Sequence, residues 1–132
     1  MKTTLIAFAT AAALIVPQAG AMAQNAVATE TFTAARPTDV LSYNLIGLNV
    51  VNGQNESVGE IKDLILSQGE LAGYILSVGG FLGIGERYVI VRPNAIKIAY
   101  SDKDAKWTAV MNTTRDALKA APEFKYEGRW KR

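Results

Sequence analysis

The chain has 132 residues, a small net charge of +2, and neither histidine nor cysteine. This length suits one domain. The small net charge argues against nonspecific electrostatic binding to nucleic acid. Without cysteine there is no disulfide, and without histidine or cysteine the usual zinc and copper ligands are missing. We therefore expect no cofactor, no bound metal and no nucleic-acid partner.

The first 23 residues have the pattern of a secretory signal peptide. Lys2 supplies a positive charge, residues 5–16 form an apolar run, and Ala21 and Ala23 precede a cut at Gln24. The apolar run is shorter than the about 20 residues that span a bilayer. We therefore expect cleavage after Ala23, a periplasmic protein, and no transmembrane segment in the cleaved product.

The next part of the chain divides into a lead-in and a β-rich domain. Residues 24–40 lack apolar periodicity, which predicts a flexible lead-in. Residues 41–112 alternate between apolar and polar side chains in short runs separated by turn residues, which predicts an all-β domain. Its second strand should contain a bulge or a strong bend near residues 61–63, where the apolar pattern changes face. The six predicted strands cover residues 45–51, 57–66, 71–78, 87–92, 96–100 and 106–111.

Residues 113–132 are predicted to form a short helix and a basic, aromatic tail. Thr113 and Asp116 resemble a capping box that opens a helix over residues 115–121. In the tail, we expect Phe124 and Tyr126 to pack on the domain, since a small fold gains core area that way. Four further tail residues are candidates for contact with a partner or with an anionic membrane surface: Arg129, Trp130, Lys131 and Arg132.

Several segments resemble the PRC-barrel domain family, in family order within residues 43–98. They are Leu45-Ile46-Gly47-Leu48, Val58-Gly59-Glu60-Ile61, the glycine-rich loop at residues 79–85, and Val89 to Pro93. The resemblance implies a six-stranded antiparallel barrel. It also implies protein contacts, as made by the cytoplasmic domain of the photosynthetic reaction centre H subunit and the C-terminal domain of a ribosome maturation factor. The ending at residues 118–126 is similar to that of small exported proteobacterial members.

The glycine-rich loop has three possible interpretations. A nucleotide-binding role lacks support, because a strand pattern rather than a helix follows the loop. Its glycines, Gly79, Gly80, Gly83 and Gly85, suit a tight chain reversal. We expect the apolar loop residues to plug a barrel end, with an exposed partner or dimer patch as the alternative: Phe81, Leu82 and Ile84.

Acidic residues give the remaining candidate sites. Asp63 lies in an apolar run, so an inward orientation would require a buried polar contact, for which Arg87 and Arg92 are the candidate partners. Glu56, Glu60 and Asp63 together could serve a carboxylate-based enzyme only if they met on one face. Asp102-Lys103-Asp104 lacks the later glycine and glutamate of a calcium loop, which indicates a polar turn.

These patterns predict a non-enzymatic periplasmic domain that contacts itself or another envelope protein. The alternative is a module that binds a small ligand or an anionic surface through the barrel mouth or the basic tail. An enzyme that uses carboxylates is the third hypothesis.

Overall fold

The computed structural model describes residues 31–79 and 85–132. Residues up to Asp39 and residues from Val40 onward form two separate units. In the first unit, Arg36 and Asp39 form an ion pair with an N–O distance of 2.9 Å. Several sequence-based expectations concern residues outside the described ranges: the signal peptide, residues 24–30 of the lead-in, and Gly80, Phe81, Leu82, Gly83 and Ile84.

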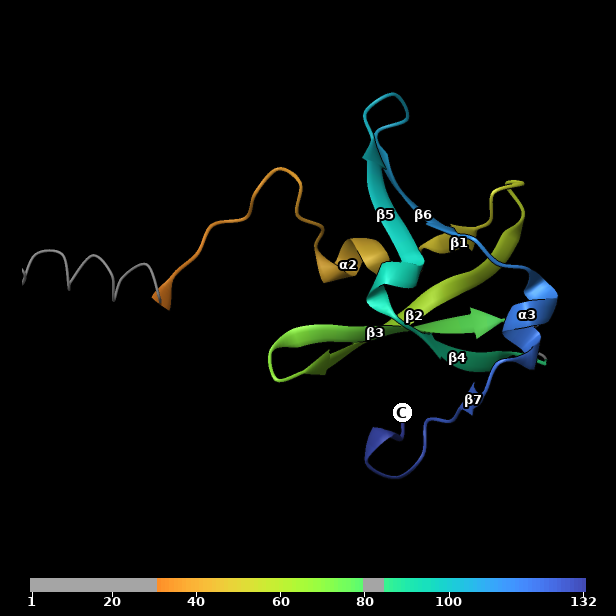
Figure 1. Ribbon diagram of the computed structural model, residues 1–132. Helices are drawn as coiled ribbons and strands as arrows, with labels where there is room; N and C mark the ends of the chain where they lie inside the picture. Colours follow the sequence, from red (N-terminus) through yellow and green to blue (C-terminus); the bar gives the residue numbers. More distant parts are fainter. Residues whose placement is uncertain (1–30, 80–84) are drawn as a thin grey trace, which may run out of the picture. The chain divides into compact units, whose positions relative to one another are not determined.

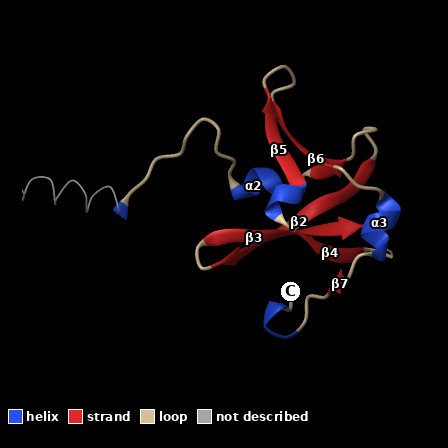
Figure 2. Ribbon diagram, in the orientation of Figure 1, coloured by secondary structure: helices blue, strands red, loops and turns tan. Residues whose placement is uncertain are grey.

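The second unit consists mainly of strands, joined by short helices and turns (Figure 2). None of the helices in the described residues is long and apolar enough to cross a bilayer. In chain order the elements are α2 (Ser42–Leu45), β1 (Asn49–Val51), β2 (Ser57–Ser67), β3 (Glu70–Val78), β4 (Arg87–Val91), the 3-10 helix η1 (Pro93–Ala95), β5 (Ile96–Ser101), β6 (Lys106–Met111), α3 (Arg115–Ala120), β7 (Glu123–Phe124) and the 3-10 helix η2 (Gly128–Trp130).

The strands form an open mixed sheet, so the expected six-stranded, closed, antiparallel barrel is wrong in these three respects. Across the described residues the sheet has seven strands in the order β5-β6-β1-β2-β3-β4-β7. β1 and β6 run parallel where Val50 pairs with Ala109, and β5 and β7 lie at unjoined edges. Alternation of apolar and polar residues shows which side chains share a face of a strand. It does not show which strands pair with one another, or in which direction.

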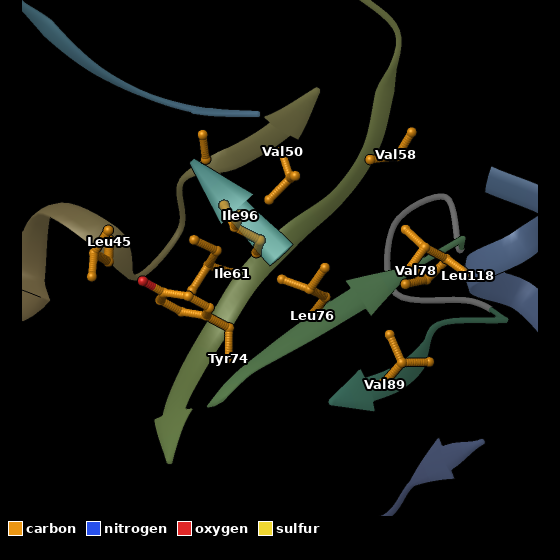
Figure 3. Packing of buried hydrophobic residues seen from close by; sticks show 11 residues of the cluster. Leu45, Val50, Val58, Ile61, Tyr74, Leu76, Val78, Val89, Ile96 and Leu118 are labelled. Atoms are coloured by element: carbon orange, nitrogen blue, oxygen red, sulfur yellow. The ribbon is translucent and has the colours of Figure 1, made fainter. Parts of the chain in front are cut away.

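The hydrophobic core lies on one face of this sheet, which curves around it. Figure 3 shows Ile96 of β5 and Val50 of β1 gathered with Ile61 and Leu76 of the neighbouring strands. Val89 of β4 belongs to the same buried cluster, although β4 and β5 are far apart in the strand order. The sheet therefore coils enough to enclose one core without closing into a barrel.

The first predicted strand is shorter than expected, because a glycine interrupts it. Residues 42–45 form α2, which buries Leu45, and β1 begins only at Asn49. Between them Gly47 has a φ of 89°, a left-handed conformation that interrupts an extended strand and suits glycine. Its amide donates to the carbonyl of Ile61 at 2.7 Å, so the turn is tied to β2.

The predicted turn at Asn52 is present and gives a first testable prediction. Asn52 is buried, and its side-chain oxygen accepts from the amides of Gln54 at 3.1 Å and Glu56 at 3.0 Å. Replacing Asn52 with alanine should lower the free energy of unfolding by about 1–3 kcal/mol, because both amides lose their acceptor. Chemical denaturation measures this. Gly53→Ala should be nearly neutral, since the added Cβ would meet no atom within 4 Å.

The predicted helix α3 begins at Arg115, as expected, but its N-cap differs from the predicted one. Thr114, rather than Thr113, is the N-cap residue, and its hydroxyl oxygen accepts from the amide of Ala117 at 3.0 Å. Two adjacent threonines offer equivalent hydroxyls, so the sequence alone does not choose between them. The helix buries Leu118 in the core.

Candidate functional site

A bulge in β2 turns the side chain of Asp63 away from the core. Ile61 pairs with Leu76, and Asp63 pairs with the next residue back along β3, Ile75. Lys62 is therefore an extra residue in the strand, as the predicted bulge required. Without it, Asp63 would share the inward face of Ile61. The bulge thus moves this carboxylate to the outer face, so the inward orientation considered for Asp63 does not occur.

The C-terminal tail crosses this outer face and is held there by aromatic contacts. Figure 1 shows the tail beside β3 and β4, on the side away from β5 and β6. Phe124 pairs with Tyr88 through β7. The ring of Tyr126 meets those of Tyr88 and Phe124 edge to face, with centroid separations of 5.0 and 5.1 Å. Phe124 and Tyr126 thus pack on the sheet, as the sequence predicted.

The end of the tail folds back towards the same cluster. Gly128 has a φ of 62° and starts the 3-10 helix η2, so the chain reverses there. The reversal brings the ring of Trp130 to 5.8 Å from that of Phe124. The guanidinium of Arg132 then lies 5.0 Å from the ring centre of Tyr126, a cation–π contact.

Tail and sheet together enclose a pocket of about 370 Å³, which we call the tail pocket. Its floor contains Ile75, which is only 4% exposed although it lies outside the main core cluster. Three apolar side chains around it stay open to solvent: Leu66 is 69% exposed, Ile90 48% and Trp130 62%. The lining residues are Asp63, Leu64, Ile65, Leu66, Ile75, Ile90, Phe124, Tyr126, Trp130 and Arg132.

Asp63 links the polar part of the pocket to the tail. One of its carboxylate oxygens accepts from the amide of Leu64 at 2.9 Å, and the other accepts from the hydroxyl of Tyr126 at 3.3 Å. Burial, followed by the negative charge of Asp63, raises the pKa of Tyr126 from its ordinary value of 10.0 to about 12. Both causes disfavour the phenolate.

The pKa of Tyr126 gives a second prediction. The folded protein favours the neutral phenol of Tyr126 more than the unfolded chain does. The resulting contribution to the free energy of unfolding is therefore complete below pH 10 and is lost as the pH rises towards about 12. Ultraviolet titration of tyrosinate should show a late transition that Tyr126→Phe removes, beside that of Tyr74, whose pKa burial also raises. Asp63→Asn should move that transition to lower pH. A transition unchanged by Asp63→Asn would contradict the contact.

Beyond the pocket, the same region of β2 and β3 carries a polar cluster that the sequence did not reveal. The ammonium of Lys62 lies 3.6 Å from a carboxylate oxygen of Glu60 and 3.9 Å from one of Glu86. The buried hydroxyl of Ser77 donates to the same oxygen of Glu86. The hydroxyl of Ser77 therefore has a hydrogen-bond partner in Glu86, as a buried polar group in a strand requires.

The two arginines suggested as partners of Asp63 have other positions. Arg87 donates to the carbonyls of Lys119 at 2.7 Å and Ala121 at 2.8 Å. It therefore caps the C-terminal end of α3, where a cation is favourable. Arg92 is exposed. The proposed pairing of Asp63 with either arginine is thus replaced by the contact with Tyr126.

The described ends of the glycine-rich loop, Gly79 and Gly85, have φ values of 69° and 74°. Other residues rarely adopt this conformation, so both positions favour glycine. An added Cβ at Gly79 would lie 3.6 Å from the side chain of Lys119. These two glycines join β3 to β4 next to α3.

The acidic residues have separate surroundings. Glu60 faces Lys62, Asp63 faces Tyr126, and Glu56 is exposed in the turn before β2. Asp104 accepts from the hydroxyl of Ser101 in the β5–β6 turn. No group of three or more His, Cys, Asp or Glu residues within 31–79 and 85–132 could hold a metal ion.

The tail pocket was missed in the sequence because its two halves are distant along the chain. The candidate surface residues Arg129, Trp130, Lys131 and Arg132 are all exposed. The third predicted strand carries apolar residues on both of its faces, but this pattern does not show that the tail would lie over one of them. The available signal was an apolar residue, Ile75, on the face opposite Tyr74 and Leu76.

The region that resembles known proteins contains only part of this site. The family model of the PRC-barrel domain matches residues 37–118, and no curated protein matches the chain. The sheet side of the tail pocket lies inside the matched region. Phe124, Tyr126, Trp130 and Arg132 lie beyond it.

Proposed function

The chain belongs to the PRC-barrel domain family, and we propose that it serves as a non-enzymatic binding module of the cell envelope, in contact with another envelope protein or with a second copy of itself. The tail pocket is the proposed contact site. A domain fold does not fix a function, so the proposal depends on this site and not on the family alone.

The observation that carries the proposal is the group of exposed apolar side chains at the tail pocket. Leu66, Ile90 and Trp130 are exposed side by side around one hollow. Isolated apolar residues on a surface are ordinary, whereas a patch around a concavity is typical of an interaction site. A partner that inserts an apolar group there would remove this area from water.

Site-specific photo-crosslinking in intact cells tests the proposal. A crosslinking amino acid at Leu66 should give one reproducible protein adduct, identified by mass spectrometry as an envelope protein or as a dimer of the chain. The same amino acid at Val110, which is 37% exposed on β6 and does not line the pocket, is the matched control. Equal adducts from both positions, or no adduct from Leu66, would contradict the proposal.

We also propose that the protein works in the periplasm after loss of its first 23 residues. The support is the order of a charged start, an apolar run and a small-residue cut in the sequence. Mass spectrometry of the protein released by osmotic shock should then give a chain that starts at Gln24. A full-length chain in the cytoplasmic fraction would refute this.

Binding of a small ligand is the second candidate function, because the size of the pocket permits it. Ligand pockets commonly hold about 300–1,000 Å³, and the tail pocket has about 370 Å³. Thermal-shift measurements on Trp130→Ala and the parent protein, against a panel of envelope metabolites, separate this candidate from protein binding. A shift in the parent that the variant lacks would favour the small ligand.

A further inference from the structure

The tail carries positive charge that nothing in the described structure neutralises. Between residues 123 and 132 it has four basic side chains and two acidic ones. Within residues 31–79 and 85–132, no carboxylate lies at ion-pair distance from any of the four. All four are exposed: Lys125, Arg129, Lys131 and Arg132. Arg132 lines the tail pocket, whose lining residues Phe124, Tyr126 and Trp130 alternate in sequence with the other three.

The one carboxylate among the described residues that line the pocket, that of Asp63, already accepts hydrogen bonds from the protein. Both oxygens of Asp63 accept hydrogen bonds from the protein itself, from the amide of Leu64 and from the hydroxyl of Tyr126. Arg132 lies over the ring of Tyr126 and forms no ion pair with Asp63. A positively charged ligand would therefore meet the carboxylate of Asp63 and four like charges in the tail, whereas a negatively charged one would meet cations that form no ion pair in the described residues.

The shape and size of the pocket favour a protruding side chain. Its floor is apolar, with Ile75 nearly buried and Ile90 half-exposed. A volume of about 370 Å³ is at the small end of the range for ligand sites. A flat membrane surface cannot fill such a hollow, whereas one large apolar side chain of a peptide can enter it and act as an anchor.

We infer that the tail pocket binds an acidic segment of a partner protein. One apolar side chain of that segment enters the pocket, and carboxylates on either side of it contact the tail cations. The inference rests on the proposed binding function and specifies the chemistry of the partner.

Fluorescence of Trp130 provides the test. The chain has two tryptophans, so Trp107→Phe leaves Trp130 as the single reporter and retains an aromatic ring beside Tyr100. A short peptide in which glutamate alternates with leucine should change the emission of Trp130 saturably, and less at high salt. Two control peptides replace glutamate with lysine or leucine with serine, and both should bind at least about tenfold more weakly.

Charge-reversal variants distinguish the effect of the tail cations on binding from the effect of the net charge of the protein. Arg129→Glu with Arg132→Glu should weaken binding of the acidic peptide by about tenfold. Lys97→Glu with Lys106→Glu makes the same charge change on β5 and β6, away from the pocket, and should leave affinity within about twofold. The pair Lys125→Glu and Lys131→Glu repeats the test without disturbing the contact between Arg132 and Tyr126.

The outcomes distinguish the inference from the proposed function. Equal binding of the glutamate and lysine peptides would overturn the acidic partner and leave a contact site for proteins. Saturable binding to phosphatidylglycerol vesicles, without binding of any peptide, would replace the protein segment by a lipid surface. Failure of all these probes, together with no crosslink from Leu66, would also remove the proposed function.

Discussion

Replacement of Leu76 with alanine should lower the free energy of unfolding by about 3 kcal/mol, within the usual range of about 2–5 kcal/mol for such a change. Leu76 is completely buried in the middle of β3, in the cluster that Val50, Ile61 and Val89 also share. The loss combines the transfer of apolar atoms with the cavity that they leave. Denaturant unfolding followed by circular dichroism measures it.

The matched control for this prediction is the same substitution at Leu66. This side chain lies near the end of β2 and is 69% exposed, so Leu66→Ala should change stability by less than about 0.5 kcal/mol. A similar loss at both leucines would show that Leu66 is covered in solution, which would point to self-association through the tail pocket. Dependence of that loss on protein concentration would identify the dimer.

Much of the sheet could be predicted because its strands carry a clear local signal. β6 has the predicted bounds, Lys106–Met111, and β2 to β5 begin and end within one or two residues of the predictions. β5 alternates between apolar and polar residues, β3 is an almost continuous apolar run, and turn residues separate the strands. The bulge at Lys62 was also visible, because one inserted residue shifts the apolar pattern from one face to the other.

The pairing of the strands could not be predicted from the same signal. β7 has two residues, Glu123 and Phe124, too few to show any periodicity. The parallel pair of β1 and β6 joins Val50 to Ala109, and nothing local in either strand specifies that neighbour. Closure of the barrel was expected from the family resemblance, but the described sheet keeps β5 as an edge strand.

The site shows the same division between local and distant information. The sequence correctly predicted that Phe124 and Tyr126 would pack on the domain. It did not predict the partner of Asp63, because that contact needs both the bulge at Lys62 and the path of a tail 63 residues further on. Single exposed residues such as Trp130 can therefore be proposed from the sequence. A pocket formed by segments that are distant along the chain cannot, because it depends on how those segments pack.

Phe124 should be the side chain that holds the tail in place, and its replacement is the sharpest test of the site. It pairs with Tyr88 through β7 and contacts the rings of Tyr126 and Trp130. Aromatic pairs contribute about 0.5–1.5 kcal/mol each beyond the area that they bury. Phe124→Ala should therefore lower the free energy of unfolding by about 2 kcal/mol, measured by denaturant unfolding.

A second readout distinguishes release of the tail from a general loss of stability. In Phe124→Ala the pKa of Tyr126 should fall from about 12 towards its ordinary value of 10.0, because the phenol loses both its cover and its place beside Asp63. Trp130→Ala, at a position 62% exposed, should leave that pKa high and cost less than about 1 kcal/mol. It should also weaken binding of the acidic peptide, measured by calorimetry because the variant lacks the fluorescent reporter. If Phe124→Ala left the titration of Tyr126 unchanged, the tail would keep its position without Phe124, and the pocket would not depend on this contact.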